Sequence, residues 1–224
     1  MHQQKENVGQ MAGTILFGID VESASESTVG FVRYGLPLFE SLQVPVTWYV
    51  TGKTLEKYPD LFREADRHPL IDLQAHTYNH VLLKTIWLKV PPGKEIHGSR
   101  DYFVKRGEPP DVVNADLAKC QGVFEEVLGR RALGLTTPWG YYRGLGDRPD
   151  LLEIVWNHGF RFLRSFARNE TDGQPVLLDW QPFSYACHGY ADMVELLLHD
   201  YQDDFYWEAF SDHGPHETYA DHMM

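Results

Sequence analysis

The segment His76-Thr77-Tyr78-Asn79-His80 carries two imidazoles four residues apart. Across one turn of helix, this spacing turns both rings the same way, so two nitrogens can reach a single divalent ion. With 11 histidines in 224 residues, a random order would give roughly 0.5 such pairs, so the spacing alone is weak evidence. The pair is a candidate metal site that needs support from other residues.

Two acids, Asp20 and Glu22, give that support. Residues two apart on a strand project to the same face, where two carboxylates repel unless a cation offsets their charge. A catalytic zinc takes three protein ligands and leaves one position open for water. One acid with His76 and His80 supplies that set, and the other acid becomes a candidate base. In the alternative reading, both acids only cap the turn that follows the strand.

The elements that position these residues are predicted to alternate along the chain. Apolar or β-branched runs indicate strands at 14–20, which should be buried on both faces, and at 44–50, 71–77, 132–137, 160–166 and 193–198. Apolar residues at three- and four-residue steps indicate helices at 27–42, 59–67, 111–128 and 149–157. Alternation implies an α/β fold with a parallel sheet, either open or closed into a barrel, whose strands end at the site.

The length fits one domain over residues 14–224, after a polar and flexible segment at 1–13. The stretch at about 81–110, with its Pro and Gly residues, is predicted to be a long loop or insertion. A net charge of −12 argues against nucleic acid and anionic lipid as partners. The sequence shows neither a secretory signal nor a membrane-spanning run, which predicts a cytoplasmic protein. The oligomeric state stays open.

Four motifs in this order resemble the polysaccharide deacetylase (NodB-homology, carbohydrate esterase 4-like) family. They are the strand that ends in the acid pair, the strand 46–52, the histidine box 76–80 and Pro138-Trp139-Gly140. The resemblance spans roughly 14–199. It implies a distorted (β/α)-barrel, usually of seven strands, that removes N-acetyl groups from amino sugars with a divalent metal.

Carried over by position, the resemblance makes Asp20 the general base and Glu22, His76 and His80 the ligands of the metal, for which we expect Zn²⁺. The family usually has Asp where this chain has Glu22, and an Asp-x-Glu spacing resembles the allantoinase-like branch. The backbone N–H of Trp139 would stabilise the oxyanion. The rings of Trp139, Tyr141 and Tyr142 could also stack on a sugar.

The family motif Arg-x-Pro-aromatic-Gly is Thr136-Thr137-Pro138-Trp139-Gly140 here, so the arginine that orients the catalytic acid is absent. Arg164 lies on the following predicted strand. We therefore hypothesise that Arg164, or failing it Arg143, pairs with Asp20 by charge. The alternative is an exposed Arg164 without a partner.

The family's general acid belongs to a Leu-x-His motif, which Leu197-Leu198-His199 matches. The same segment also resembles one that precedes the last strand of allantoinase-like relatives. In that case the barrel is incomplete at the C-terminus, and the acid is absent or comes from His213, His216 or His222.

These features predict a metal-dependent hydrolase of C–N amide bonds that deacetylates an N-acetylated sugar or glycan. A rival within enzymes is a hydrolase of cyclic amides or ureides with the same metal site. A rival of another class is a non-catalytic carbohydrate-binding relative, motivated by the absent arginine.

Overall fold

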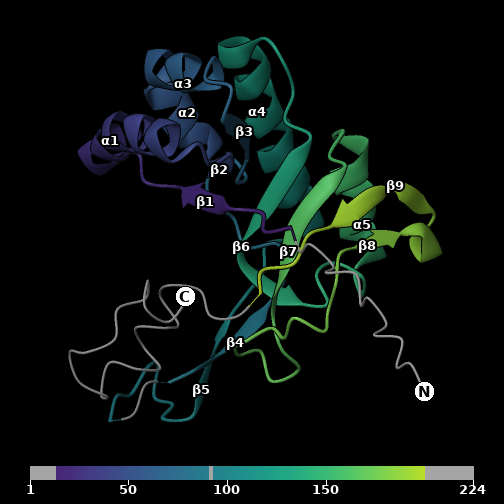
Figure 1. The fold of residues 1–224 in the computed structure, drawn as a ribbon. Helices are drawn as coiled ribbons and strands as arrows, with labels where there is room; N and C mark the ends of the chain where they lie inside the picture. Colours follow the sequence, from purple (N-terminus) through teal and green to yellow (C-terminus); the bar gives the residue numbers. More distant parts are fainter. Residues whose placement is uncertain (1–13, 91–92, 200–224) are drawn as a thin grey trace, which may run out of the picture.

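The computed structural model describes residues 14–90 and 93–199 and contains a seven-stranded sheet and a separate two-stranded hairpin (Figure 1). The large sheet has the order β1-β2-β3-β6-β7-β9-β8, in which only β8 runs antiparallel to its neighbour. The fold is therefore α/β, as predicted. The strands of this sheet are β1 (Gly18–Val21), β2 (Val46–Val50), β3 (Ile71–Ala75), β6 (Gly134–Tyr142), β7 (Phe162–Arg168), β8 (Phe183–Tyr185) and β9 (Tyr190–Glu195).

Helices occur at each of the four predicted places, and one further helix follows β2. The bounds are α1 (Glu26–Leu42), α2 (Gly52–Lys57), α3 (Pro59–Asp66), α4 (Pro110–Leu128) and α5 (Pro149–Asn157), with a 3₁₀ turn η1 at Ala186–His188. Helix α1 contains Pro37 in its interior and continues through it. Helix α4 ends at Gly129, which has the left-handed conformation common at helix ends. In the described chain, no helix is long and apolar enough to cross a membrane.

The core lies between the parallel strands and helices α1 to α4, which gather on one side of Figure 1. In the middle of the sheet, Trp48 of β2 pairs in register with Leu73 of β3, and both side chains are fully buried. Phe62 of α3 and Phe124 of α4 are buried in the same cluster. This packing accounts for the nearly continuous apolar character of the inner strands.

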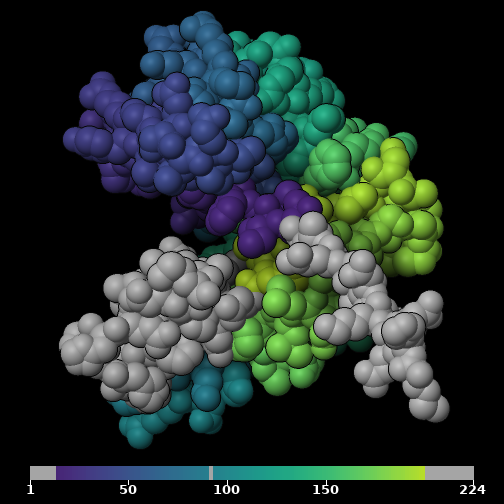
Figure 2. Space-filling model, in the orientation of Figure 1, coloured from purple at the N-terminus to yellow at the C-terminus, as the bar shows by residue number. Residues whose placement is uncertain are grey.

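The first predicted strand is shorter and less buried than its sequence suggested. It begins at Gly18, and the preceding Ile15, Leu16 and Phe17 are 78%, 69% and 52% exposed. The prediction of a strand buried on both faces at 14–20 is therefore wrong. The reason is topological, because β1 pairs only with β2 and forms one edge of the sheet, while β8 forms the other edge. Over residues 14–90 and 93–199 the sheet is thus open rather than closed into a barrel. Figure 2 shows the N-terminal segment that includes β1, coloured purple, at the surface.

The stretch at 81–110 contains a hairpin, where the sequence predicted a long loop or insertion. Strands β4 (Ile86–Lys89) and β5 (Tyr102–Lys105) pair antiparallel. In β4, Ile86 and Leu88 are buried and alternate with exposed residues, but four residues are too few to stand out among the neighbouring Pro and Gly. The Lys84 ammonium ties the base of the hairpin to the carbonyl of Gly144, at 2.8 Å.

Strand β6 carries a bulge where the sequence predicted its end. Its pairing with β7 shifts register between Thr136 and Tyr141, and Trp139 and Gly140 have φ of 69° and 58°. A Cβ atom at Gly140 would lie 2.2 Å from the Cβ of Ala167, so only glycine fits there. The bulge removes the backbone of Trp139 from the regular hydrogen-bond ladder between β6 and β7.

A buried carboxylate, that of Glu195, joins the far strands of the sheet. It accepts hydrogen bonds from the backbone N–H of Ser165 at 2.6 Å and of Phe166 at 2.7 Å, from the Ser165 hydroxyl at 2.8 Å and from the Tyr185 hydroxyl at 2.6 Å. Burial raises the pKa of Glu195, and these hydrogen bonds oppose that effect. The Tyr185 oxygen in turn accepts from the N–H of Leu145, at 3.2 Å. One side chain thereby connects β7, β8, β9 and the segment after β6.

Candidate active site

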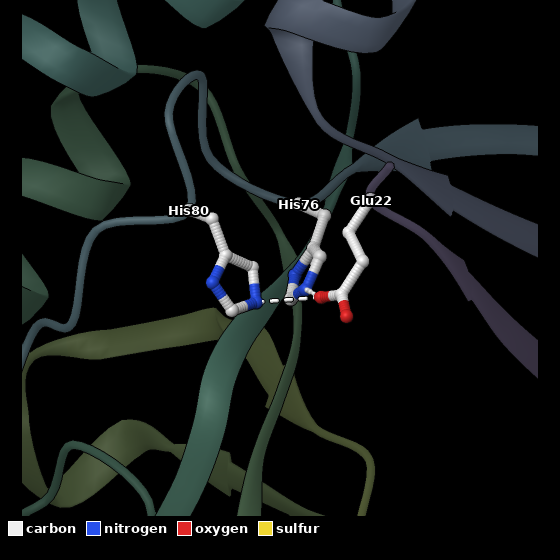
Figure 3. Close-up of side chains that lie close together, drawn as sticks. All are labelled: Glu22, His76 and His80. Carbon is white, nitrogen blue, oxygen red and sulfur yellow. Dashed lines mark hydrogen bonds and ion pairs between the residues drawn. The ribbon is translucent and has the colours of Figure 1, made fainter. Parts of the chain in front are cut away.

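Three side chains from separate parts of the chain converge at the carboxyl ends of β1 and β3. Glu22 follows β1, and His76 and His80 follow β3. Their ligand atoms lie within 4.8 Å of one another and point toward a common centre (Figure 3). The Glu22 Oε2 atom lies 3.2 Å from Nε2 of His76 and 2.6 Å from Nε2 of His80. These are the three residues that the sequence analysis predicted as metal ligands.

The ring of His76 is oriented by the neighbouring strand β6. Its Nδ1 lies 3.2 Å from the carbonyl oxygen of Thr136, and the side chain is almost fully buried. A carbonyl can only accept a hydrogen bond, so we assign the ring proton to Nδ1. That tautomer directs the Nε2 lone pair toward Glu22, the arrangement that backbone carbonyls commonly impose on metal-binding histidines.

The three atoms need a shared positive charge. Without one, the unprotonated Nε2 of His76 would face a carboxylate oxygen, lone pair against lone pair. Contacts with His76 and then His80 hold the pKa of Glu22 well below its usual range, so Glu22 is an anion. In a tetrahedral zinc site, ligand atoms about 2.1 Å from the ion lie about 3.4 Å apart. The Glu22–His76 separation of 3.2 Å is close to this value, whereas the Glu22–His80 separation of 2.6 Å is shorter. The donor set Glu-His-His fits a divalent ion with nitrogen and oxygen ligands.

The histidine box is a turn rather than the helical turn that its spacing suggested. Thr77 and His80 have φ of 57° and 55°, outside the helical region. The turn is held by Asp116 of α4, whose carboxylate accepts from the N–H groups of Tyr78 at 2.7 Å and Asn79 at 3.0 Å. Sequence reasoning missed Asp116, although an acid on the apolar stripe of a helix was a usable signal.

Asp20 of β1 pairs with Arg164 of β7. The Arg164 Nη2 contacts Oδ1 of Asp20, its Nε donates to the hydroxyl of Thr136 at 2.9 Å, and its guanidinium lies over the ring of Tyr49 at 4.5 Å. The Arg164 side chain is 10% exposed. The alternative of an exposed, unpaired Arg164 is therefore wrong, and the geometry is the one that our hypothesis for the absent motif arginine required. Arg143 lies elsewhere, over the rings of Tyr142 and Trp180.

Gly18 leaves the space that Arg164 occupies. A Cβ atom at this position would lie 2.6 Å from Nη1 of Arg164 and 3.0 Å from the ring of Tyr49. We expect Gly18→Ala to displace the guanidinium from Asp20 and to lower the free energy of unfolding by about 1–3 kcal/mol. Urea denaturation measures this change. The control is Gly30→Ala in α1, where a Cβ would meet nothing within 4 Å; a Gly18→Ala protein as stable as the wild type would contradict the prediction.

The three aromatic residues proposed to stack on a sugar differ in exposure. Tyr141 is buried, and its hydroxyl accepts from the N–H of Leu83 at 2.9 Å, so the suggestion that it contacts a sugar is wrong. Trp139 is half-buried in the bulge, and Lys105 covers its ring. Tyr142 is half-buried beside Arg143.

His199 is half-buried and lies beyond the end of β9, where the N–H of Leu198 donates to the carbonyl of Phe166 on β7 at 3.0 Å. Its Nε2 lies 2.7 Å from the carbonyl oxygen of Trp180. The structure thus places His199 near the carboxyl end of β7 but outside the cluster formed by Glu22, His76 and His80. The alternative acids His213, His216 and His222 lie outside the described residues.

Several solved structures resemble this fold. A protein from Mycobacterium smegmatis assigned to the polysaccharide deacetylases is 20% identical, with a TM-score of 0.51 over 82% of this chain and 57% of that one. A family 4 carbohydrate esterase from Streptomyces lividans is 13% identical, with a TM-score of 0.47 over 68% of this chain and 62% of that one. An allantoinase is 15% identical, with a TM-score of 0.47 over 82% of this chain and 51% of that one.

This chain thus spans between half and two thirds of the length of each of these three structures. None of the curated proteins compared with the chain matches it. A family model described as polysaccharide deacetylase, however, matches residues 20–161, more than half of the sequence. The match includes the acid pair, the histidine box and the Pro-Trp-Gly motif. The chain therefore belongs to the polysaccharide deacetylase family.

Proposed function

We propose that this protein hydrolyses the acetamide C–N bond of an N-acetylated sugar or glycan and that a divalent metal, zinc, assists the reaction. The observation that carries the proposal is the convergence of Glu22, His76 and His80 beside the paired Asp20 and Arg164. Both groups lie at the carboxyl ends of parallel strands, where α/β proteins place their active sites.

Each residue has a separate part in this proposal. A divalent ion bound by Glu22, His76 and His80 would polarise the acetamide carbonyl and make water acidic. Asp20, oriented by Arg164, takes the proton from the attacking water. The N–H of Trp139, in the bulge of β6, donates to the developing oxyanion. His199 delivers a proton to the departing amine nitrogen.

The pairing of Asp20 with Arg164 favours catalysis over the non-catalytic alternative. The absent motif arginine was the sequence feature that suggested a binding protein. Thr136 occupies that position, and its hydroxyl accepts a hydrogen bond from Arg164. The guanidinium therefore reaches Asp20 from β7 instead of β6, and the acid keeps a cationic partner.

The test is an assay of the purified protein after removal of bound metal and reloading with zinc. The substrates are neutral and acidic N-acetylated sugars, short N-acetylated oligosaccharides and cyclic ureides. We expect acetate and free amine in equal amounts from at least one acetylated sugar, and a loss of about 100-fold or more in Asp20→Asn at unchanged zinc content. Ring opening of a ureide without deacetylation would favour the cyclic-amide rival. Sugar binding without turnover of any substrate would favour the binding protein.

A further inference from the structure

Lys105, the last residue of β5, brings a positive charge from the hairpin to the bulge of β6. Its ammonium lies 3.9 Å from the centre of the Trp139 ring, although the lysine itself is exposed to solvent. Trp139 follows Thr136 by three residues, and the Thr136 carbonyl contacts His76. Because the backbone N–H of Trp139 is the proposed oxyanion donor, the ammonium lies beside a residue of the proposed site.

This lysine forms no ion pair with a carboxylate in the described chain, whereas Lys84, at the base of the same hairpin, pairs with Asp147 at 2.5 Å. A second cation, Arg168, lies below the bulge and donates to the carbonyls of Trp139 at 3.0 Å and Gly140 at 3.2 Å. Partial burial, and then the charge of Arg168, lower the pKa of Lys105. Lys105 thus lies beside a second cation at the bulge, whose charge Asp172 partly offsets.

The position of Lys105 changes what Trp139 can contact. A cation close to the face of an indole is held by the ring and covers it. The covered face cannot stack on a neutral sugar ring. The exposed ammonium instead offers a partner to an anion.

We propose that Lys105 determines substrate specificity by binding a carboxylate carried by the N-acetylated substrate, so that the preferred substrate is an acidic amino sugar. The inference takes from the proposed function that the ligand is an N-acetylated sugar. It does not require that the protein hydrolyses that sugar. It assigns to the hairpin a role in recognition.

The test compares by calorimetry the binding of matched sugars to the zinc-loaded Asp20→Asn protein, in which hydrolysis is expected to be too slow to interfere, and the Lys105 variants are made in the same background. The probes are N-acetylglucosamine and its 6-carboxylate, an N-acetylated sugar with a carboxylate on the 3-oxygen, and N-acetylglucosamine 6-phosphate. We expect at least one carboxylate to bind about tenfold tighter than the neutral sugar, and the preference to fall as salt is added. Lys105→Ala should abolish the preference, and Lys105→Arg should retain it.

Arg106→Ala is the matched control, because it removes an equal and exposed charge from the next residue. It should leave the preference unchanged. Equal affinity for neutral and acidic sugars, no measurable binding of any acidic probe, or a preference that survives in Lys105→Ala would each overturn the proposal. Tighter binding of the phosphate alone would overturn the choice of carboxylate. Binding is measured without turnover, so an acid preference in a protein that hydrolyses nothing would refute the proposed function and leave this inference standing.

Discussion

Replacing His76 with alanine is expected to lower the affinity for zinc by more than about 100-fold. Changes to residues that merely support metal ligands already cost about 10–100-fold, and His76 is a proposed ligand with a buried and oriented ring. Competition with a coloured chelator measures the affinity. A second readout is thermal unfolding, because zinc at 1,000 times its dissociation constant stabilises the wild type by about 4 kcal/mol. In His76→Ala, a loss of 100-fold or more in affinity should reduce this stabilisation to about 1.4 kcal/mol or less at the same zinc concentration.

His80→Ala should behave in the same way, since its Nε2 contacts the same Glu22 oxygen. His97→Asn is the control, because His97 is exposed on the hairpin and asparagine tolerates its φ of 50°. Its zinc affinity should equal that of the wild type. Full zinc content in both His76→Ala and His80→Ala would refute the ligand assignment.

Replacing Arg164 with methionine is expected to reduce the proposed hydrolysis by about 100-fold or more at unchanged zinc affinity. The guanidinium orients Asp20, and small misplacements of a reacting group cost on the order of 100-fold. Stability should fall as well. Breaking a buried pair costs about 3–5 kcal/mol, but Asp20 is 34% exposed, so we expect about 1–3 kcal/mol. Steady-state kinetics and urea denaturation separate the two effects, and the loss should appear mainly in kcat.

Arg143→Met is the matched control, because this guanidinium lies over Tyr142 and Trp180. A stronger test moves the cation back to β6 in the double variant Thr136→Arg with Arg164→Thr. Partial recovery of kcat relative to Arg164→Met is expected, because position 136 pairs with position 164 across the two strands. An Arg164→Met protein with wild-type turnover would show that Asp20 does not need this partner.

Residues whose roles depend on local pattern were predictable from the sequence. The parallel strands and the helices at 27–42, 111–128 and 149–157 follow from hydrophobic periodicity, which survives in the folded protein because it decides what is buried. The convergence of Glu22 with His76 and His80 was predictable for a related reason. Strand ends in an α/β fold meet at one edge, so acids and imidazoles that follow strands come together.

Residues whose roles depend on distant partners were not predictable in the same way. Asp116 holds the histidine box from a helix that lies 38 positions further along the chain from Tyr78. The pairing of Arg164 with Asp20 was only a hypothesis until the register of β6 and β7 was known. The prediction that Ile15 is buried was wrong for a related reason. An apolar run shows that its residues are suited to a buried strand, but it does not show whether a neighbouring strand covers them.

Glu195 sets a boundary for shortening this protein. Its carboxylate satisfies backbone N–H groups of β7 beside Arg164, so a chain cut before this residue would leave two buried donors without an acceptor. The cut would also separate the Tyr185 hydroxyl from its acceptor and so loosen its contact with Leu145. Arg164 would then lie on a strand whose neighbouring backbone donors are unsatisfied. The region matched by the family model ends at residue 161, and that region by itself would lack both Arg164 and the buried acid that secures its strand.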